Sequence, residues 1–557
     1  MPVQDRQRRL SYEDEDRRER LSYADRDRLK PVLLMMLTLR QQGLGLAAIT
    51  LAVFWPTLFA DFVYDARLQI VTGDFIHDPW NWLPVLSFGV LGMDVLDFNR
   101  PVHLASLMLD AAIWGREPFG YHLTSVLLHV VNVVMVWGVI RQAGSLPHRV
   151  GSLPHREEGR QAEGLSYFFA AVLFAVHPVV TEAVCEPTFR EDLLATAFSL
   201  GALLLAMRHD AARGSDRWRA IAIATCCLLA VGSKESGYAA PLLVAIYWWL
   251  CRRDEPAGFW KAAIGGGLAA TAAFLAARFL LEPAQSAIFE AKPQYPGGSL
   301  AAAMAIEPRI LALYAQLIAL PVNLCADYGL YSVRHLPLPV ALAIVAGLAA
   351  TAFFAIRADR RMILPVAMIV LPLLPVANLI PIYRAAADRY LYFPMAGIAL
   401  AIGLFLDSAW LAARPRLREI ATIAGMAAAV VLGMACIERQ KVWATPLALW
   451  EDTFRKNPVA YTAASGLAES LREAGRLPEA ERAAREAIRL SEEKRGDAWA
   501  TLALILDGQG REAEALEAAG KAVEVDPKLA DPEGRVRVLA MERHVAEEWG
   551  RLLKRKK

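Results

Sequence analysis

The amino-acid sequence predicts an all-α protein, with a polytopic membrane domain followed by a soluble array of helical repeats. Of its 557 residues, 55% are hydrophobic, and the mean hydropathy is +0.30, above the range of ordinary soluble domains. Apolar runs of about twenty residues, the length that crosses a bilayer, recur up to residue 438. Charged residues gather instead in the first residues, the short loops and the final part. We therefore expect three parts: a charged tail (1–42), a membrane domain (43–438) and a repeat domain (439–557).

Residues 1–42 begin with a stretch rich in Arg, Asp and Glu. Such a composition buries too little apolar surface to fold alone, and it lacks the early apolar core of a secretory signal, so it predicts a disordered cytoplasmic tail. The net charge of +2 is spread among interleaved acids, which gives no indication of nucleic-acid binding. The six cysteines form no CxxC pair and lie mostly in apolar runs, so we expect neither disulfides nor a cysteine metal site.

Eleven apolar segments are candidates for membrane crossings. They are 43–60, 120–140, 165–184, 190–207, 219–233, 236–251, 261–281, 340–356, 362–381, 390–410 and 419–436. Loops rich in Arg and Lys stay in the cytoplasm, which places the amino terminus inside and the repeats outside a cell membrane, such as a bacterial inner membrane. The segment 309–325, broken by Pro321, is interpreted as interfacial or re-entrant. If it crosses, the count changes and the carboxyl terminus lies inside.

The first external loop, 61–119, combines tryptophans with apolar runs at 83–92 and 102–114. Tryptophan prefers the membrane interface, so these runs predict helices that lie in it.

The final part of the chain contains an internal repeat. Gly475-Arg476 recurs as Gly510-Arg511, a spacing of ~35 residues that is typical of tetratricopeptide repeats. Arrays of this kind bind extended peptides in a concave groove, so an acceptor protein or peptide is the expected partner. The alternative is that the repeats only dock on the membrane domain or form dimers.

Ionisable residues recur at the turns between apolar segments on the expected external face. Bilayers tolerate such residues mainly where they pair or line a polar cavity. This pattern predicts an enzyme or a transporter, and it exceeds what a passive anchor needs. The candidate residues are Asp61, Asp65, Arg100, Glu182, Arg190, Asp192, Lys234, Glu235 and Arg389.

Within this set, Asp65 follows the first crossing and is the candidate general base, which would take a proton from an acceptor hydroxyl. Its alternative role is to cap the next helix or pair with Arg67. The basic residues are candidates to hold a lipid phosphate, namely Arg100, Arg190, Lys234 and Arg389. The remaining acids, Asp61, Glu182, Asp192 and Glu235, are expected to support them.

Several motifs carry a family resemblance. They are Phe-Val-Tyr-Asp at 62–65, Arg100-Pro101, Pro-Phe-Gly-Tyr-His at 118–122, Val-His-Pro at 176–178, Ser-Lys-Glu-Ser-Gly at 233–237, Pro-Val-Ala-Asn-Leu at 375–379 and Asp-Arg-Tyr-Leu-Tyr at 388–392. In this order they resemble the transmembrane and tetratricopeptide-repeat-containing family, which is related to protein O-mannosyltransferases and other GT-C glycosyltransferases. The resemblance implies a GT-C membrane domain, a polyprenyl-phosphate-linked sugar as donor, and an external active site with Asp65 at the catalytic position.

The chain departs from the family pattern at one position. The family usually has two adjacent acids after the aromatic residue, and here the second is Ala66. If the second acid is essential to an enzyme of this type, this chain is either impaired or uses Glu182, Asp61 or Asp192 in its place.

The sequence thus predicts a glycosyltransferase that moves a mannose-like sugar from a polyprenyl phosphate to a Ser/Thr or other hydroxyl. No cofactor is fixed, and a divalent metal is left open. A non-catalytic membrane scaffold that displays the repeats is the alternative. A transporter is less consistent with charged residues gathered at one face, because the site of a transporter would lie near the bilayer midplane.

Overall fold

The structure, a computed structural model, describes residues 38–144, 157–209, 217–281, 294–531 and 543–556. Within those ranges every regular element is a helix. The α-helices up to residue 442 are α3 (Leu39–Phe54), α4 (Tyr64–Ala66), α5 (Trp82–Leu86), α6 (Pro101–Trp114), α7 (Pro118–Gly144), α8 (Glu157–Val176), α9 (Thr181–Cys185), α10 (Arg190–Met207), α11 (Arg217–Ser233), α12 (Ala239–Cys251), α13 (Ala257–Leu281), α14 (Leu300–Ala319), α15 (Gly329–Arg334), α16 (Leu338–Ala358), α17 (Ile363–Leu373), α18 (Tyr392–Leu406), α19 (Ala409–Ala412) and α20 (Pro415–Val442).

Short 3₁₀ turns and one π-helical turn join these helices. They are η1 (Trp55–Phe59), the π-helical η2 (Arg67–Thr72), η3 (Phe75–His77), η4 (Pro79–Asn81), η5 (Gly89–Gly92), η6 (Pro178–Val180), η7 (Pro187–Phe189), η9 (Glu235–Tyr238), η10 (Arg360–Met362), η11 (Leu374–Val376) and η12 (Asp388–Leu391).

The first helix, α3, begins at Leu39, before the boundary expected at residue 43. A reciprocal cap explains the earlier start: the Thr38 side chain accepts the Gln41 N–H, and the Gln41 side chain accepts the Thr38 N–H at 2.6 Å. The last residues of the expected tail are therefore helical. Residues 1–37, on which the rest of that prediction falls, lie outside the described residues.

Seven helical segments of the described chain are long and apolar enough to cross a membrane, and the bent pair Ser166–Val176 and Pro178–Cys185 makes up to eight. The chain is thus a multi-pass membrane protein. The predicted eleven crossings are not confirmed by this test. Three of the expected crossings are shorter helices: α11 has 17 residues, α12 has 13 and α17 has 11. Helix α10 has 18 residues but carries three charged residues, Arg190, Glu191 and Asp192, in its first turn.

Helix α14 is the segment that the sequence placed in the interface. By length and composition it qualifies as a crossing. Two of its hydrogen bonds reach neighbouring loops: Arg309 donates to the Leu336 carbonyl at 2.8 Å, and His177 bonds the Ile318 carbonyl at 3.0 Å. The helix ends at Ala319, just before Pro321.

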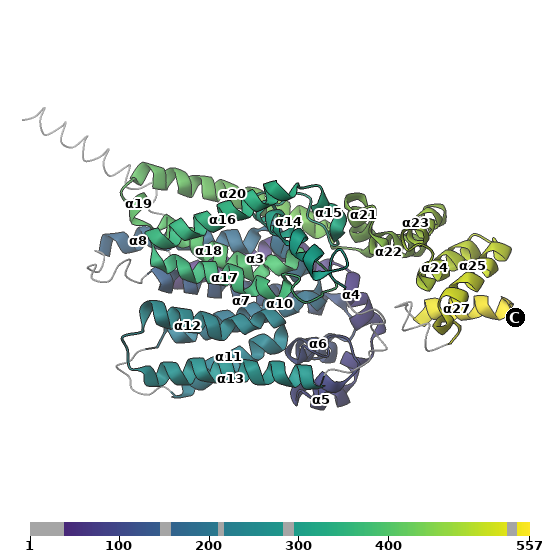
Figure 1. Cartoon of the computed structure of the whole chain (residues 1–557), viewed down its shortest axis with the longest axis horizontal. Helices are drawn as coiled ribbons and strands as arrows, with labels where there is room; N and C mark the ends of the chain where they lie inside the picture. Colours follow the sequence, from purple (N-terminus) through teal and green to yellow (C-terminus); the bar gives the residue numbers. More distant parts are fainter. Residues whose placement is uncertain (1–37, 145–156, 210–216, 282–293, 532–542, 557) are drawn as a thin grey trace, which may run out of the picture.

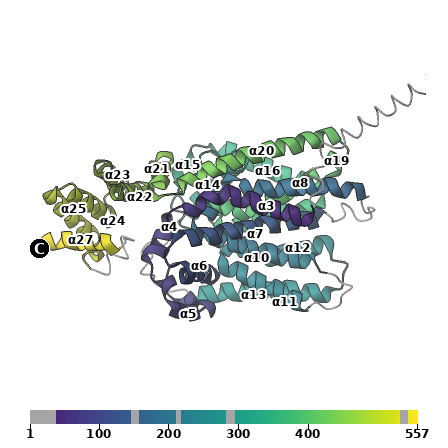
Figure 2. The same ribbon diagram turned by 180° about the vertical axis from the view of Figure 1, so that it is seen from behind.

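The long helices pack side by side around a continuous apolar core. Helix α7 contacts α3, α8 and α10, and α11 packs between α10 and α13, whereas α18 joins α8 and α17. Figures 1 and 2 show α4, α5 and α6 together at one end of this bundle. We call that end the first-loop end, because residues 61–119 lie there. The expected interfacial run 102–114 forms α6.

The C-terminal helices lie beyond the first-loop end (Figures 1 and 2). They are α21 (Pro446–Lys456), α22 (Tyr461–Glu473), α23 (Leu477–Leu490), α24 (Gly496–Gly508), α25 (Glu512–Val525), the 3₁₀ turn η13 (Pro527–Ala530) and α27 (Arg543–Lys556). Each of α21 to α25 packs on the next around an alanine-rich core. Gly475 and Gly510 occupy equivalent turns with φ of +73° and +75°, a conformation that glycine adopts readily. The tetratricopeptide assignment stays a prediction.

Ion pairs tie these C-terminal helices to the first-loop end. Arg67 makes a two-pronged pair with Glu473 of α22, at 2.8 and 2.7 Å. Arg439 at the end of α20 bonds Asp452 of α21 at 2.7 Å, and Lys456 bonds the same carboxylate at 2.7 Å. The helices that follow the membrane domain are therefore held directly against the loop that carries Asp65.

Candidate active site

The turn Val63–Arg67 places Asp65 at the first-loop end. Tyr64 has φ of +50°, which is uncommon for a bulky residue and requires support from its surroundings. That support is aromatic: the ring of Tyr64 stacks on Trp450 of α21, with centroids 5.4 Å apart, and meets Phe189 edge-on at 5.6 Å. The conformation of the turn thus depends on both the membrane domain and α21.

Glu186 supports the same turn from below. Its buried carboxylate accepts the Ala66 N–H at 3.1 Å and the Thr188 hydroxyl at 2.7 Å. Burial raises the pKa of Glu186 well above its usual range, while the Thr188 and Ala66 hydrogen bonds lower it. The sequence analysis assigned Glu186 no role. The only sequence feature that could have indicated Glu186 is the short polar segment Glu186-Pro187-Thr188 before a helix. Nothing in the sequence links that segment to residue 66.

Asp65 itself is exposed and, among the described residues, makes no hydrogen bond or ion pair. The protein around it displaces water and raises the pKa of Asp65 above its usual range, while Arg389 and then Arg384 lower it. An ionised carboxylate without a partner, close to cations, can accept a proton from a bound hydroxyl. The alternative that Asp65 pairs with Arg67 has no support, since Arg67 bonds Glu473.

Arg389 forms a buried pair with Glu182. The guanidinium lies 2.5 Å from Oε1 of Glu182, whose Oε2 accepts the Arg389 backbone N–H at 3.0 Å. The guanidinium also covers the ring of Phe189 at 3.9 Å from its centroid. This arrangement joins α9 to η12 beside Asp65.

Arg384 provides a second cation near Asp65 and lies over the Tyr64 ring, 5.7 Å from its centroid. It pairs with Asp327, and the same Asp327 carboxylate accepts the hydroxyl of Thr462 in α22. A C-terminal helix thus shares one carboxylate with a cation of the candidate site.

A larger network of charges lies on the other side, between α6, α10 and η9. Arg100 bonds Glu191 at 2.5 Å and Asp97 at 2.9 Å, and approaches Glu235 at 3.4 Å. Lys234 bonds Asp192 at 2.5 Å.

Three further contacts belong to this network. Lys234 also reaches Glu191, at 3.2 Å, and lies over the Tyr390 ring. Glu235 pairs with Arg278 of α13 at 3.0 Å. Every cation of the network therefore already has a carboxylate partner.

Two predicted residues are not brought into this group. Arg190 is fully buried, bonds Asp110 at 2.6 Å and donates to the Tyr121 carbonyl at 2.8 Å, a purely internal set of contacts. Asp61 is exposed, and its backbone N–H donates to the Ala444 carbonyl at 3.0 Å.

The other predicted residues share the first-loop end. They are Asp65, Arg100, Glu182, Asp192, Lys234, Glu235 and Arg389. Several residues that connect them are not among those predicted from the sequence, namely Asp97, Glu186, Glu191, Arg278 and Asp327.

Restoring the missing family acid should be costly here. The Ala66 side chain is fully buried in an apolar cluster, and its N–H already bonds the Glu186 carboxylate. Ala66→Asp would bury a second carboxylate beside the first, so we expect a loss of about 3–5 kcal/mol in the free energy of unfolding. Thermal unfolding in detergent measures it. Ala66→Asn, of nearly the same size without the charge, is the control, and equal stability of the two variants would contradict the charge argument.

Comparison with known proteins gives a consistent set of relatives. No protein-family model matches the chain. The protein O-mannosyl-transferase F38B6.6 of Caenorhabditis elegans is 26% identical over 392 residues, which is 65% of this chain and 51% of that protein. The mouse protein O-mannosyl-transferase TMTC3 is 23% identical over 403 residues, 64% of this chain and 41% of that protein. This chain thus spans about half the length of the curated relatives it matches.

The solved structure of ArnT from Cupriavidus metallidurans bound to undecaprenyl phosphate aligns with 91% of this chain and 86% of that chain, at 13% identity and a TM-score of 0.39. The likeness concerns the course of the helices alone. Human protein O-mannosyl-transferase TMTC2 is 30% identical over 173 residues, 30% of this chain and 19% of that protein. By sequence, the chain is therefore similar to the transmembrane and tetratricopeptide-repeat-containing O-mannosyl-transferases, the family that its motifs resemble.

Proposed function

We propose that the protein is a membrane glycosyltransferase that moves a mannose-like sugar from a polyprenyl phosphate to a hydroxyl group, with Ser or Thr of a protein as the preferred acceptor. The observation that carries this proposal is Asp65, an exposed carboxylate without a bonding partner among the described residues, close to Arg384 and Arg389 at the first-loop end. The names of the curated relatives support the same reaction class.

In the proposed reaction, Asp65 takes the proton of the acceptor hydroxyl as its oxygen attacks the anomeric carbon of the sugar. The bond between that carbon and the phosphate oxygen breaks, and the lipid phosphate leaves with the electron pair. Configuration at the anomeric carbon inverts, because attack and departure occur on opposite faces. Proton removal of this kind contributes about 10²–10⁴-fold to rate.

The leaving phosphate gains negative charge, which nearby cations stabilise. Arg389, Arg100 and Lys234 are the proposed groups, and each already pairs with a carboxylate. A phosphate would therefore share these cations with Glu182, Glu191 and Asp192, with Arg able to bind two oxygens and Lys acting as a point charge. Arg190 is not proposed as a phosphate ligand, because its buried guanidinium already pairs with Asp110.

We also propose that the first-loop end and the C-terminal helices face the outside of a cell membrane, a bacterial inner membrane being the expected one, with the charged tail (1–42) in the cytoplasm. The C-terminal part (439–557) would then present the acceptor to the membrane domain (43–438). The shared bonds of Asp327 to Arg384 and Thr462 support such coupling, because one end of that network lies in α22 and the other beside Asp65.

Accessible cysteines would test the orientation. In a protein with its native cysteines replaced, we expect a cysteine at Arg360 to label only from the cytoplasm and one at Lys494 only from outside. Both positions are exposed, and the Lys494 side chain is 75% accessible. The reason is the concentration of Arg and Lys in the loops at the far end of the bundle. Cytoplasmic labelling at Lys494 would contradict the proposed topology.

The activity is tested with purified protein, radiolabelled polyprenyl-phosphate mannose and Ser/Thr-containing peptides. Radiolabel in the peptide that is released by β-elimination supports O-linked transfer. Failure to transfer from any lipid-linked sugar would favour the scaffold alternative, in which the C-terminal helices bind peptides without chemistry.

A further inference from the structure

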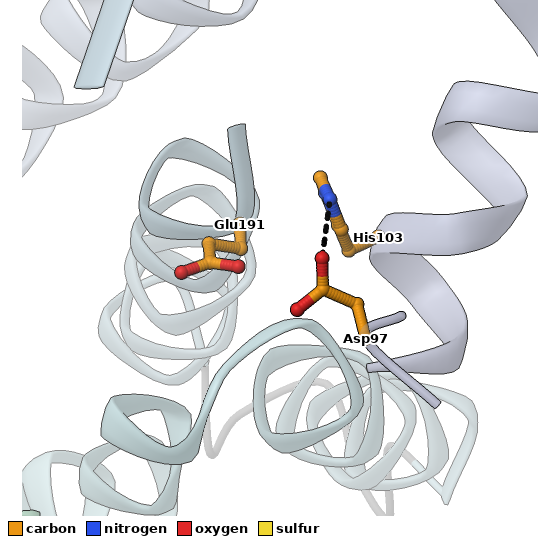
Figure 3. Close-up of side chains that lie close together, drawn as sticks. All are labelled: Asp97, His103 and Glu191. Atoms are coloured by element: carbon orange, nitrogen blue, oxygen red, sulfur yellow. Dashed lines mark ion pairs between the residues drawn. The ribbon is translucent and has the colours of Figure 1, made fainter. Parts of the chain in front are cut away.

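Three potential metal ligands converge at the first-loop end, in the network of charges between α6, α10 and η9. Asp97 comes from the loop after η5, His103 from the first turn of α6, and Glu191 from the first turn of α10 (Figure 3). One ligand atom of each lies within 4.8 Å of the other two. Ligands of a tetrahedral zinc ion lie ~3.4 Å apart, given bonds near 2.1 Å. A small inward rotation of the carboxylates would therefore bring the three ligand atoms to the spacing that a metal ion needs.

His103 is the feature that distinguishes this group from an ordinary acidic cluster. Its side chain is 0% exposed, and among the residues that the structure describes neither ring nitrogen has a hydrogen-bond partner. Figure 3 shows the imidazole directed at Asp97, whose Oδ2 lies 3.8 Å from Nε2, too far for a hydrogen bond.

The burial of His103, without a hydrogen-bond partner for its ring among the described residues, suits a metal ligand. A neutral imidazole is a common metal ligand, and a buried polar group left without a partner is otherwise unfavourable.

Among the residues that the structure describes, the ion-paired charges around the cluster do not balance. The network contains four carboxylates and three cations. The carboxylates are Asp97, Glu191, Asp192 and Glu235, and the cations are Arg100, Lys234 and Arg278. Arg190 lies near His103 as well, but Asp110 neutralises it. One negative charge is left over, and the unpaired Asp65 nearby adds a second. A divalent cation would neutralise both.

The existing bonds leave room for such an ion. An ionised carboxylate offers about four lone-pair sites, so Asp97 and Glu191 can hold Arg100 and a metal at once. Asp97 bonds Arg100 through Oδ1 and turns Oδ2 toward His103, with Gln69 donating to Oδ2 at 3.2 Å.

We propose that Asp97, His103 and Glu191 bind one divalent first-row transition-metal ion, with Mn²⁺ and Zn²⁺ as the fitting ions. The imidazole argues against Mg²⁺ and Ca²⁺, which prefer oxygen ligands throughout. Three protein ligands leave at least one position open for water or another oxygen donor. The proposal does not depend on sugar transfer.

The test uses the purified full-length protein in detergent, stripped with a chelator and then titrated with Mn²⁺ or Zn²⁺. We expect one ion retained per chain after gel filtration, measured by elemental analysis. Loading with Co²⁺ should give visible absorption bands of a site with nitrogen and oxygen ligands. A wild-type protein that retains no ion, or gives no such bands, would overturn the proposal.

Two variants and a matched control locate the site. His103→Leu and Asp97→Asn should each weaken binding at least ~10-fold, since loss of groups that only orient ligands already costs that much. His122→Leu is the control, because His122 is also fully buried but lies outside the three-residue group. If His103→Leu fails to fold, Asp97→Asn, at a half-buried position, decides alone. Retention of the ion by the folded variants, or equal loss in His122→Leu, would refute the assignment.

Discussion

Replacing Asp65 by Asn is expected to lower sugar transfer by about 10²–10⁴-fold, the usual contribution of a general base. Asn has nearly the same shape but cannot accept the proton of the attacking hydroxyl. The change should leave the fold intact, because the Asp65 carboxylate is exposed and makes no bond to any described residue. The turn itself is held by neighbours, through the stacking of Tyr64 on Trp450 and the bond from Ala66 to Glu186.

The measurement is the initial rate of label transfer from polyprenyl-phosphate mannose to a Ser/Thr peptide, with expression and thermal unfolding as checks on the fold. Asp61→Asn is the matched control, since Asp61 is an exposed carboxylate of the same loop and, among the described residues, bonds only through its backbone. Equal transfer by Asp65→Asn and wild type would remove Asp65 from the mechanism. A similar loss in Asp61→Asn would point to the loop's charge in general.

The helices could be predicted because their signal is local. An apolar run of membrane-spanning length lies within one helix and can be recognised without knowing what that helix contacts. Long helices such as α7 and α20 therefore contain the segments that the sequence predicts for them. The number of crossings was harder. The apolar signal of α10 is diluted by the charged residues that open it, and α14, which the sequence favours as interfacial or re-entrant, is long and apolar enough to cross.

The candidate site was predictable only in part, because charge pairing depends on three-dimensional contacts. Arg190 and Arg389 look alike in the sequence, each beside an acid at a turn, yet one is bonded internally to Asp110 and the other lies beside Asp65. His103 carries no local signal either, since it is one histidine in an apolar helix. Its significance arises when α10 brings Glu191 next to it.

The buried pair of Arg389 and Glu182 gives the second large expected effect. The side chains are 10% and 1% exposed, so Arg389→Ala would leave the Glu182 carboxylate buried without its cation. Breaking one side of such a pair typically costs about 3–5 kcal/mol. We expect a loss of this size in the free energy of unfolding. Thermal or denaturant unfolding in detergent measures it. The double variant Arg389→Ala/Glu182→Gln should recover much of it, because a neutral amide can still accept the backbone N–H of residue 389.

Arg389→Lys separates this structural role from a role in donor binding. Lysine keeps the positive charge beside Glu182, so the protein should fold with a smaller loss of stability than Arg389→Ala. Lysine cannot, however, offer two parallel N–H groups to a phosphate. It also lacks the planar guanidinium that covers the Phe189 ring. If Arg389 binds the leaving phosphate, the folded Arg389→Lys protein will show a raised KM for the lipid-linked sugar and an unchanged KM for the acceptor peptide. Wild-type donor kinetics in that variant would show that donor binding does not need the two parallel N–H groups of Arg389, and would contradict the bidentate role proposed for it.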